Sequence, residues 1–291
     1  MPPAVGKLQM VSKTVKGADV TIYRPLCQTA LAKRATQADE RGMTAITYHA
    51  FPGGPRLAYR FTDGTGAVLV FLPGYKSDMS GGKACALFER AAERGRAALL
   101  LDYSGCGLSG GDFVEGTLSR WRDEVLALVA AVCPGRRLVL AGSSMGGWLM
   151  LLVALAIPSQ IAGLVGIAPA PDFTDWGFDA AQKALLTTGE VLYEENPYGL
   201  EPTPTYPGFW RDGQSQLLLG REIALACPVR LLHGQEDPDV PWDVSLRLAA
   251  ALRSADVQAT LIKDGDHRLS READIALLVR TVDALLDELA D

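Results

Sequence analysis

Two adjacent serines, Ser143 and Ser144, lie between two apolar runs in the stretch VLAGSSMGGWLML, residues 139–151. Only Ser144 has glycine at both the −2 and the +2 position, in Gly142 and Gly146, so the pattern G-x-S-x-G selects it. This spacing is typical of a nucleophilic serine on a strained turn from a strand into a helix, where glycines allow neighbouring segments to approach closely. The alternative is a glycine-rich turn with a solvent-exposed serine. We predict that Ser144 is a nucleophile.

A serine hydroxyl is a weak nucleophile at neutral pH and needs a neighbouring base. The chain has three histidines, His49, His233 and His267. When the serine occupies a strand-to-helix turn of this kind, the acid and the histidine follow it along the chain. His49 precedes the serine, and the position of His233 before Gly234 indicates a structural role in a turn. His267, in the loop KDGDHRLS before the last predicted helix, is therefore the predicted base.

An acid that orients the imidazole is expected after the penultimate strand, where LLHGQEDPDVPW supplies several carboxylates. In the recurrent pattern H-G-x-x-D-x-x-V-P the acid is the fourth residue after the histidine, which is Asp237. Its carboxylate would hold the imidazole and stabilise its charged form. Asp239 is the first alternative. Asp264 and Asp266, beside the predicted base, could equally be solvated turn acids.

Acyl transfer also needs two backbone N–H groups that stabilise the oxyanion of the tetrahedral intermediate. One should come from Met145, which follows the nucleophile at the positive end of the next helix. The other should come from the loop FLPGYKSDMSGG, where Gly74 permits a turn and Tyr75 would supply its N–H. The alternative role of Tyr75 is ordinary aromatic packing.

The segment GCGLSG, residues 105–110, matches the dinucleotide-binding pattern G-x-G-x-x-G and follows a predicted strand. A dinucleotide site would open a helix at once, but GDFVEG intervenes. The next strand also ends in LAGSS rather than in an acid for the ribose. We therefore interpret the segment as a tight loop at the rim of the active site. The sequence predicts no cofactor and no metal.

These residues need a scaffold, and alternating strand and helix patterns supply one from about residue 44 onward. The alternation predicts an α/β fold whose mostly parallel sheet is covered by helices on both faces. The predicted strands are 44–50, 55–61, 67–74, 97–103, 137–144, 161–170, 229–234 and 257–265. The predicted helices are 82–95, 117–132, 145–158, a segment near 214–225, 243–253 and 272–289.

The alternation breaks at residues 171–213, which we interpret as a small cap insertion above the carboxyl ends of the strands. Residues 171–211 contain eight aromatic residues. Such a lid would suit an acyl chain or an aromatic group, with Trp176, Phe178 and Trp210 as predicted substrate contacts. The alternative is that these rings only pack the insertion onto the body.

Residues 1–43 precede the regular pattern and are predicted to form a flexible N-terminal extension, and 44–291 the main domain. Residues 1–38 carry six Lys/Arg and one acid. This basic segment could be a transit peptide to the mitochondrial matrix. The five cysteines lack metal-binding spacing and indicate a reducing compartment, so we predict a cytoplasmic protein, with the matrix as the alternative.

Composition also bears on partners. The net charge of −6 argues against a nucleic-acid partner, because such proteins carry a basic footprint. The absence of an uninterrupted apolar run of 18 or more residues predicts no membrane span. Neither feature indicates an oligomeric state.

The stretches GSSMGGW, DYSGCGLSGG, LLHGQEDPDVPW and GDHRLS resemble the α/β-hydrolase superfamily. FLPGYKSDMSGGKA, GTLSRWRDEV, GSSMGGWLM and ADIALLVRTVDALLDEL resemble bacterial relatives of the mitochondrial depalmitoylating thioesterase that also cleaves mycophenolic acid acyl-glucuronide. The resemblance covers about 44–291. It implies a serine hydrolase that acts on small-molecule acyl esters or acyl thioesters through an acyl-enzyme.

Two other functions remain compatible with the sequence. The same three side chains could serve a C–C bond hydrolase or an acyltransferase. A non-catalytic ligand-binding protein could also keep the fold, although the serine, acid and histidine in register argue against it.

Overall fold

The computed structural model describes residues 9–15, 18–24, 45–51, 53–196 and 199–290. The chain divides into two compact units, Met1–Met43 and Thr44–Asp291. In the first unit, β1 (Gln9–Val15) and β2 (Ala18–Arg24) pair antiparallel. The sequence pattern predicts no strand in this extension, so this antiparallel pair is a finding of the structure. The other residues of the extension lie outside the described part of the chain.

The second unit contains an eight-stranded sheet with the strand order β12-β11-β8-β7-β5-β6-β4-β3. β4 pairs antiparallel with β3 and β6, and the other neighbouring strands pair parallel. This sheet confirms the predicted α/β fold. The strands are β3 (Thr47–Ala50), β4 (Arg56–Thr62), β5 (Thr65–Leu72), β6 (Arg96–Leu101), β7 (Leu138–Ser143), β8 (Ile161–Ile167), β11 (Val229–Gly234) and β12 (Val257–Ile262).

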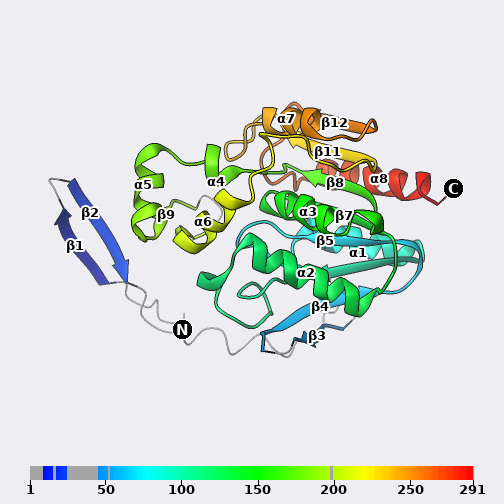
Figure 1. Ribbon diagram of the computed structural model, residues 1–291, viewed down its shortest axis with the longest axis horizontal. Helices are drawn as coiled ribbons and strands as arrows, with labels where there is room; N and C mark the ends of the chain where they lie inside the picture. Colours follow the sequence, from blue (N-terminus) through cyan, green and yellow to red (C-terminus); the bar gives the residue numbers. More distant parts are fainter. Residues whose placement is uncertain (1–8, 16–17, 25–44, 52, 197–198, 291) are drawn as a thin grey trace, which may run out of the picture. The chain divides into compact units, whose positions relative to one another are not determined.

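Helices cover both faces of the sheet (Figure 1). On one face α1 (Gly82–Glu93) packs against α8 (Glu272–Glu288), and on the other α2 (Leu118–Val132) packs against α3 (Met145–Ala156). α7 (Asp243–Ala251) packs against β12. Thr117 caps α2, because its hydroxyl accepts a hydrogen bond from the Arg120 N–H at 3.1 Å. Two short 3-10 helices complete the body, η2 (Phe113–Glu115) and η3 (Pro158–Gln160).

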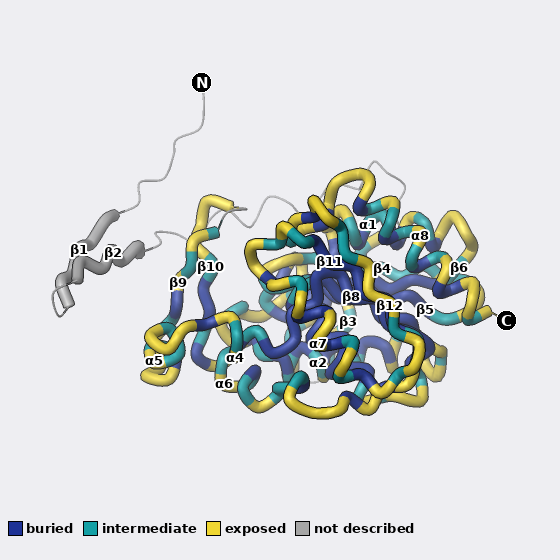
Figure 2. The backbone as a smooth tube through the Cα atoms, turned by 90° about the horizontal axis from the view of Figure 1, so that it is seen from above, coloured by how far each residue is buried: buried dark blue, intermediate teal, exposed yellow. Residues whose placement is uncertain are grey.

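Buried residues gather along the central strands of the second unit (Figure 2). Every residue of β7 and β8 is buried. α3 is buried from Met145 to Ala154, which is expected of a helix that is apolar on all sides. Trp148, on α3, is fully buried. The turn between β7 and α3 is therefore anchored in the most buried part of the molecule.

Between β8 and β11 the chain forms a separate group of small elements, which we call the cap. It consists of α4 (Phe173–Trp176), α5 (Ala180–Thr188), β9 (Leu192–Glu194), β10 (Thr203–Thr205) and α6 (Pro207–Ser215). β9 and β10 pair antiparallel as a two-stranded sheet. The cap lies beyond one end of the central sheet (Figure 1).

The helix predicted near 214–225 is wrong. α6 ends at Ser215, and residues 216–228 are irregular. The carboxylate of Asp172 accepts hydrogen bonds from the N–H groups of Leu218 and Leu219, at 2.8 and 2.7 Å. Ile223 forms an isolated bridge with Leu252. The apolar residues of this segment suggested a helix, but they belong to an irregular stretch of chain. The side chain of Asp172, distant in sequence, holds that stretch in place.

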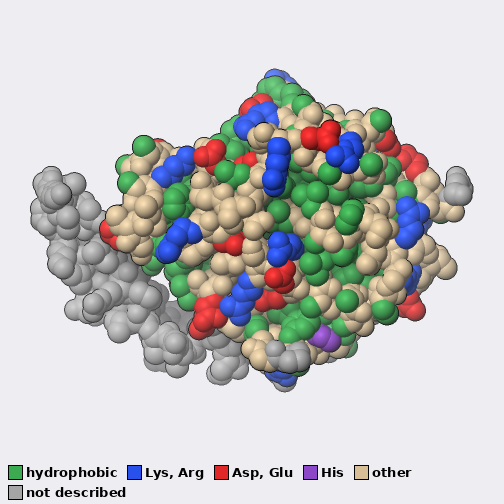
Figure 3. Space-filling model, in the orientation of Figure 1, with side chains coloured by type: hydrophobic (Ala, Val, Ile, Leu, Met, Phe, Trp, Pro, Cys, Tyr) green, Lys and Arg blue, Asp and Glu red, His purple; other side chains and the backbone are tan. Residues whose placement is uncertain are grey.

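No helix in the described ranges is long and apolar enough to cross a bilayer. On the face drawn in Figure 3, Lys and Arg side chains are interspersed with Asp and Glu over the second unit.

Candidate active site

Ser144 occupies the turn between β7 and α3, with φ 55° and ψ −122°. A positive φ is uncommon for a residue with a side chain and is often a sign of a functional turn. A Cβ on Gly146 would lie 2.1 Å from the Leu72 carbonyl oxygen, and one on Gly142 would lie 2.3 Å from the Gly146 carbonyl oxygen. The turn therefore needs both glycines. Ser143 is the last residue of β7 and is buried.

The structure brings Ser144, His267 and Asp237 together. The Nε2 atom of His267 lies 3.1 Å from Ser144 Oγ, and its Nδ1 atom lies 2.8 Å from Asp237 Oδ2. The three residues follow β7, β12 and β11, respectively. Because these strands are parallel, their carboxyl ends meet at one edge of the sheet, where α/β proteins bind ligands.

The other candidate acids have different partners. Asp264 forms an ion pair with Arg271, with 2.7 Å between the charged atoms. The carboxylate of Asp266 accepts a backbone N–H from its own loop at 2.9 Å. The backbone N–H of Asp239 donates to Asp237 Oδ1 at 2.9 Å, and Asp239 lines the cleft described below.

His233, for which the sequence indicates a structural role in a turn, is fully buried and faces the carboxylate of Asp237. Its Nε2 atom lies 3.2 Å from Asp237 Oδ2 and 3.1 Å from the Val240 carbonyl oxygen. Because a carbonyl oxygen can only accept, Nε2 carries the proton, and the Ser245 hydroxyl donates to Nδ1 across 2.7 Å. The four-residue spacing in H-G-x-x-D is the signal that could have identified this contact.

Asp237 is thus surrounded by hydrogen-bond donors. Its Oδ1 atom accepts the Asp239 and Val240 N–H groups, at 2.9 and 2.8 Å. Burial alone would raise the pKa of the Asp237 carboxyl, but hydrogen bonds from His233, His267 and the Val240 N–H outweigh burial and hold that pKa below its ordinary value. The group is therefore a carboxylate at neutral pH and can orient an imidazole.

The loop after β5 lies directly against the serine turn. A Cβ on Gly74 would lie 3.2 Å from the Ser143 carbonyl oxygen and 3.4 Å from Ser144 Cβ. Tyr75 and Met145, the two predicted N–H donors, line the same cleft as Ser144. Neither N–H group has an acceptor within the described residues. Met145 begins α3, where a backbone N–H has no partner inside the helix.

A cleft of about 720 Å³ lies over Ser144 and is walled on one side by the cap. Of the predicted substrate contacts, Trp176 and Phe178 line this cleft. Trp210 does not. Its indole N–H donates to the Thr174 carbonyl oxygen at 3.1 Å, and its ring packs inside the cap beside Phe178.

Comparison with known proteins identifies the family. Residues 64–202 match the family described as serine aminopeptidase, S33 (Hydrolase_4). The chain is 37% identical over 259 residues to the human mitochondrial palmitoyl-protein thioesterase ABHD10, an alignment that covers 86% of this chain and 83% of that protein. This chain belongs to the α/β-hydrolase family of ABHD10.

Solved structures support the assignment of this chain to the α/β-hydrolase family. Alpha/beta hydrolase domain-containing protein 10 from mouse has a TM-score of 0.79 and 37% identity, over 84% of this chain and 100% of that one. A putative hydrolase from Agrobacterium vitis S4 has a TM-score of 0.78 and 36% identity, over 83% of this chain and 99% of that one. The comparisons confirm the predicted resemblance, the fold and the prediction of an ester or thioester hydrolase.

The names of the relatives also bear on the predicted compartment. The human relative is named as a mitochondrial protein. That name supports the mitochondrial alternative, whereas the prediction that this hydrolase is cytoplasmic gains no support.

The loop 105–110 of the hydrolase is tight, but its predicted position at the rim is wrong, because none of its residues lines the cleft. It folds onto β4 instead. The Gly110 N–H donates to the Arg56 carbonyl oxygen at 2.9 Å, and the Ser109 hydroxyl accepts the Ala58 N–H at 2.8 Å. The buried carboxylate of Asp102 accepts the N–H of Leu108 at 2.8 Å and so closes the loop.

One group of described side chains in the hydrolase could hold a metal ion. The ligand atoms of Asp237, Asp239 and His267 lie within 4.8 Å of one another. A metal there would have to break the hydrogen bond between His267 and Asp237. We therefore assign Asp237 and His267 to the hydrogen-bonded contact with Ser144 and not to a metal.

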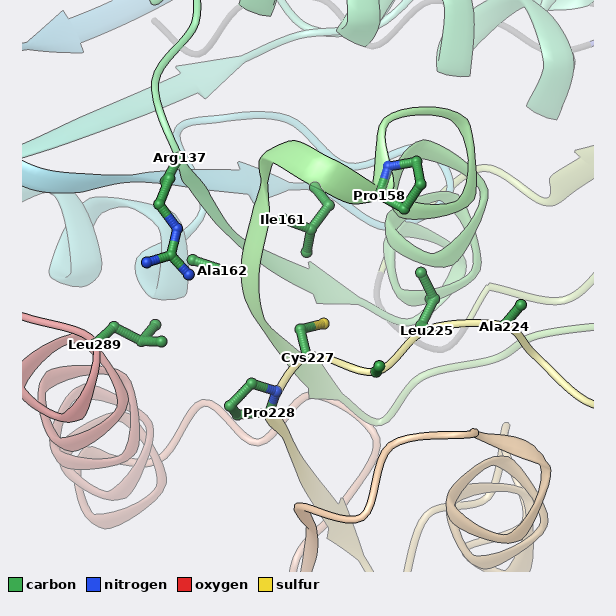
Figure 4. A pocket seen from close by; sticks show the side chains of 10 residues that line it. Arg137, Pro158, Ile161, Ala162, Ala224, Leu225, Cys227, Pro228 and Leu289 are labelled. Carbon is green, nitrogen blue, oxygen red and sulfur yellow. The ribbon is translucent and has the colours of Figure 1, made fainter.

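A second cavity, of about 290 Å³, lies at the amino ends of the strands of the hydrolase (Figure 4). Arg137 precedes β7, Ile161 begins β8 and Pro228 precedes β11. It is therefore at the edge of the sheet opposite Ser144 and does not contribute to the candidate site.

Proposed function

We propose that this hydrolase cleaves acyl esters or acyl thioesters through a Ser144–His267–Asp237 triad and an acyl-enzyme. The observation that carries the proposal is the continuous contact from Ser144 Oγ to His267 Nε2, at 3.1 Å, and from His267 Nδ1 to Asp237 Oδ2, at 2.8 Å. These distances are within hydrogen-bond reach, as proton transfer requires. Ester and thioester chemistry is favoured over C–C bond hydrolysis by the thioesterase name of the human relative.

In the proposed reaction, Ser144 Oγ attacks the acyl carbon while His267 Nε2 accepts its proton. The N–H groups of Tyr75 and Met145 stabilise the resulting oxyanion. The intermediate then collapses, the bond to the leaving oxygen or sulfur breaks, and His267 returns the proton to that atom. A water molecule attacks the acyl-serine by the same steps in reverse order, which releases the carboxylic acid and restores the hydroxyl of Ser144.

Part of the cleft wall is apolar and suits an apolar acyl group. Phe173, Trp176 and Phe178 line it from the cap, and Val240 lines it from the loop after β11. Burial of an acyl chain against such side chains contributes about 0.8 kcal/mol per methylene. We therefore propose small-molecule acyl esters or acyl thioesters as substrates, with the chain placed beneath the cap.

Two measurements test the proposed function. The wild-type protein is treated with a fluorophosphonate probe and is separately assayed on p-nitrophenyl esters and acyl-CoA thioesters of graded chain length. We expect covalent labelling at Ser144, found by peptide mass spectrometry, together with turnover of at least one series. A protein that is neither labelled nor active would be a ligand-binding member of the fold. Transfer of the acyl group to an added alcohol in place of water would indicate an acyltransferase.

We also propose that Thr44–Asp291 is the catalytic unit, since all residues of the candidate site belong to it. A truncated chain that starts at Arg41 is expected to remain soluble and to keep kcat/KM within about twofold of the full-length value, because it retains the whole of the second unit and every residue of the candidate site. Steady-state hydrolysis and a thermal melt of both proteins check this. A truncated chain that fails to fold would show that the extension is an integral part of the domain.

A further inference from the structure

The side chain of Tyr75 connects the loop after β5 to the cap. Its hydroxyl donates a hydrogen bond to the Pro204 carbonyl oxygen, in β10, at 2.9 Å. Burial raises the pKa of the Tyr75 phenol far above its ordinary value, so the hydroxyl keeps its proton and remains a donor. The bond therefore joins a residue of the candidate oxyanion hole to a strand of the cap.

The ring of Tyr75 is held from both sides. Phe113, in η2, lies with its ring centroid 5.0 Å away, and Trp121, in α2, lies 6.3 Å away. From the cap, Phe209 in α6 lies 4.8 Å away and Phe173 in α4 lies 6.5 Å away. A displacement of the cap relative to the body would therefore act on this ring as well as on its hydroxyl.

The same strand of the cap borders the cleft in which we place the substrate. Thr203 and Thr205, the neighbours of Pro204, both line the cleft over Ser144, as does Phe173. An acyl chain long enough to reach β10 would therefore contact the strand that holds the Tyr75 hydroxyl. A shorter acyl group would leave that strand without a ligand.

We propose that Tyr75 is a positioning residue whose side chain links acyl-chain binding under the cap to the placement of its own backbone N–H in the oxyanion hole. The inference rests on the proposed function. Oxyanion donors must lie about 2.7–3.1 Å from the developing charge, so small displacements of the loop change the rate of the chemical step. The proposed substrates are therefore esters or thioesters whose acyl group is long enough to contact Thr203 and Thr205. For these groups, binding energy should raise kcat and not merely lower KM.

The test replaces the hydroxyl alone. Wild type and Tyr75→Phe are assayed at steady state on two esters with the same leaving group, p-nitrophenyl acetate with a short acyl group and p-nitrophenyl decanoate with a long one. The ratio of kcat for decanoate to kcat for acetate is expected to fall about tenfold in Tyr75→Phe, the size of one neutral hydrogen bond. An unchanged ratio, including an equal loss on both esters, would overturn the proposal.

Tyr103→Phe is the matched control. The Tyr103 hydroxyl donates to the Pro73 carbonyl oxygen at 3.0 Å, so it bonds the backbone of the same loop. Tyr103 follows β6, and its described ring contact is with Trp121 in the body. Loss of this hydroxyl should lower kcat for both esters by the same factor. A fall of the ratio in Tyr103→Phe as large as in Tyr75→Phe would refute a specific link to the cap.

A thermal melt checks that each variant folds. If Tyr75→Phe does not fold, Phe209→Leu provides a second test, because it loosens the cap against the Tyr75 ring and keeps the hydroxyl. The same direction of change in the ratio is expected, and an unchanged ratio contradicts the proposal. Fluorophosphonate labelling of Ser144 in wild type separates the two hypotheses. If Ser144 is labelled but the ratio of the two kcat values is unchanged, only the proposed role of Tyr75 is rejected. If Ser144 is not labelled, the proposed function itself is rejected.

Discussion

Replacing Ser144 with alanine is expected to lower kcat for a p-nitrophenyl ester by roughly 10⁴- to 10⁶-fold, the scale observed when a triad nucleophile is removed. The Ser144 hydroxyl is the group of the candidate site that would form the covalent bond, and His267 Nε2 lies 3.1 Å from it. The residual rate would come from the oxyanion hole and from binding. Steady-state hydrolysis, corrected for the uncatalysed reaction, measures the loss.

Ser143→Ala is the control for this prediction. Ser143 is the neighbouring serine, but it is the last residue of β7 and does not occupy the turn. Its loss should reduce kcat far less than the loss of Ser144. If Ser143→Ala is the more damaging substitution in a protein that still folds, the assignment from G-x-S-x-G is wrong.

Substitutions of His267 and Asp237 are expected to cause large and non-additive losses. His267→Ala should lower kcat by about 10⁴- to 10⁶-fold and Asp237→Asn by about 10³- to 10⁴-fold, because the first removes the base and the second removes the charge that orients it. Once the imidazole is absent, the carboxylate has nothing left to position. The double variant should therefore be scarcely slower than His267→Ala in the same steady-state assay.

Asp239→Asn provides the comparison within the same loop. Asp239 reaches Asp237 through its backbone N–H, which the substitution retains. We expect Asp239→Asn to keep activity within about tenfold of wild type. The substitution changes a side chain in the wall of the cleft and leaves the three residues of the triad unchanged. If Asp239→Asn is inactive and Asp237→Asn is active, the acid of the triad is Asp239 and not Asp237.

The pKa of Asp237 has a consequence for pH dependence. Because the folded pKa lies below the ordinary value of about 4, the carboxylate remains charged at neutral and mildly acidic pH. Its contribution to stability is present above the unfolded pKa and is lost only as pH falls through the lower, folded pKa. A decline in activity between about pH 7 and pH 5 would therefore come from another group.

Local patterns predicted much of this molecule. The apolar runs of β5 and β7 and the capped helix after Thr117 are strong signals, because burial on both faces and an N-cap each leave a clear pattern in sequence. The contact between Ser144 and His267 was predictable from the order of the residues and the parallel sheet. The distance of 3.1 Å was not, since it depends on how two loops meet.

The predictions that were wrong or missing concern segments whose conformation depends on contacts with residues distant in sequence. The segment near 214–225 has helical periodicity, yet its backbone is held by the distant Asp172 carboxylate. β10 is only three residues long and contains Pro204, so it gave no strand signal. His233 was assigned to a turn because it precedes Gly234. Its burial against Asp237 depends on the packing of β11 between β8 and β12, which the local sequence does not reveal. Trp210 was assigned by composition alone, which cannot say into which side of the cap a ring points.

The position of β12 affects how the proposed base responds to partial unfolding. β12 is the edge strand of the sheet, pairs with β11 alone among the described strands, and contains no buried residue. Strands of this kind open in subglobal fluctuations that need less free energy than denaturation of the whole domain. His267 follows this strand, whereas Ser144 follows the fully buried β7. Mild denaturant should therefore detach the base from the nucleophile while the core is still intact, so that inactivation precedes global unfolding.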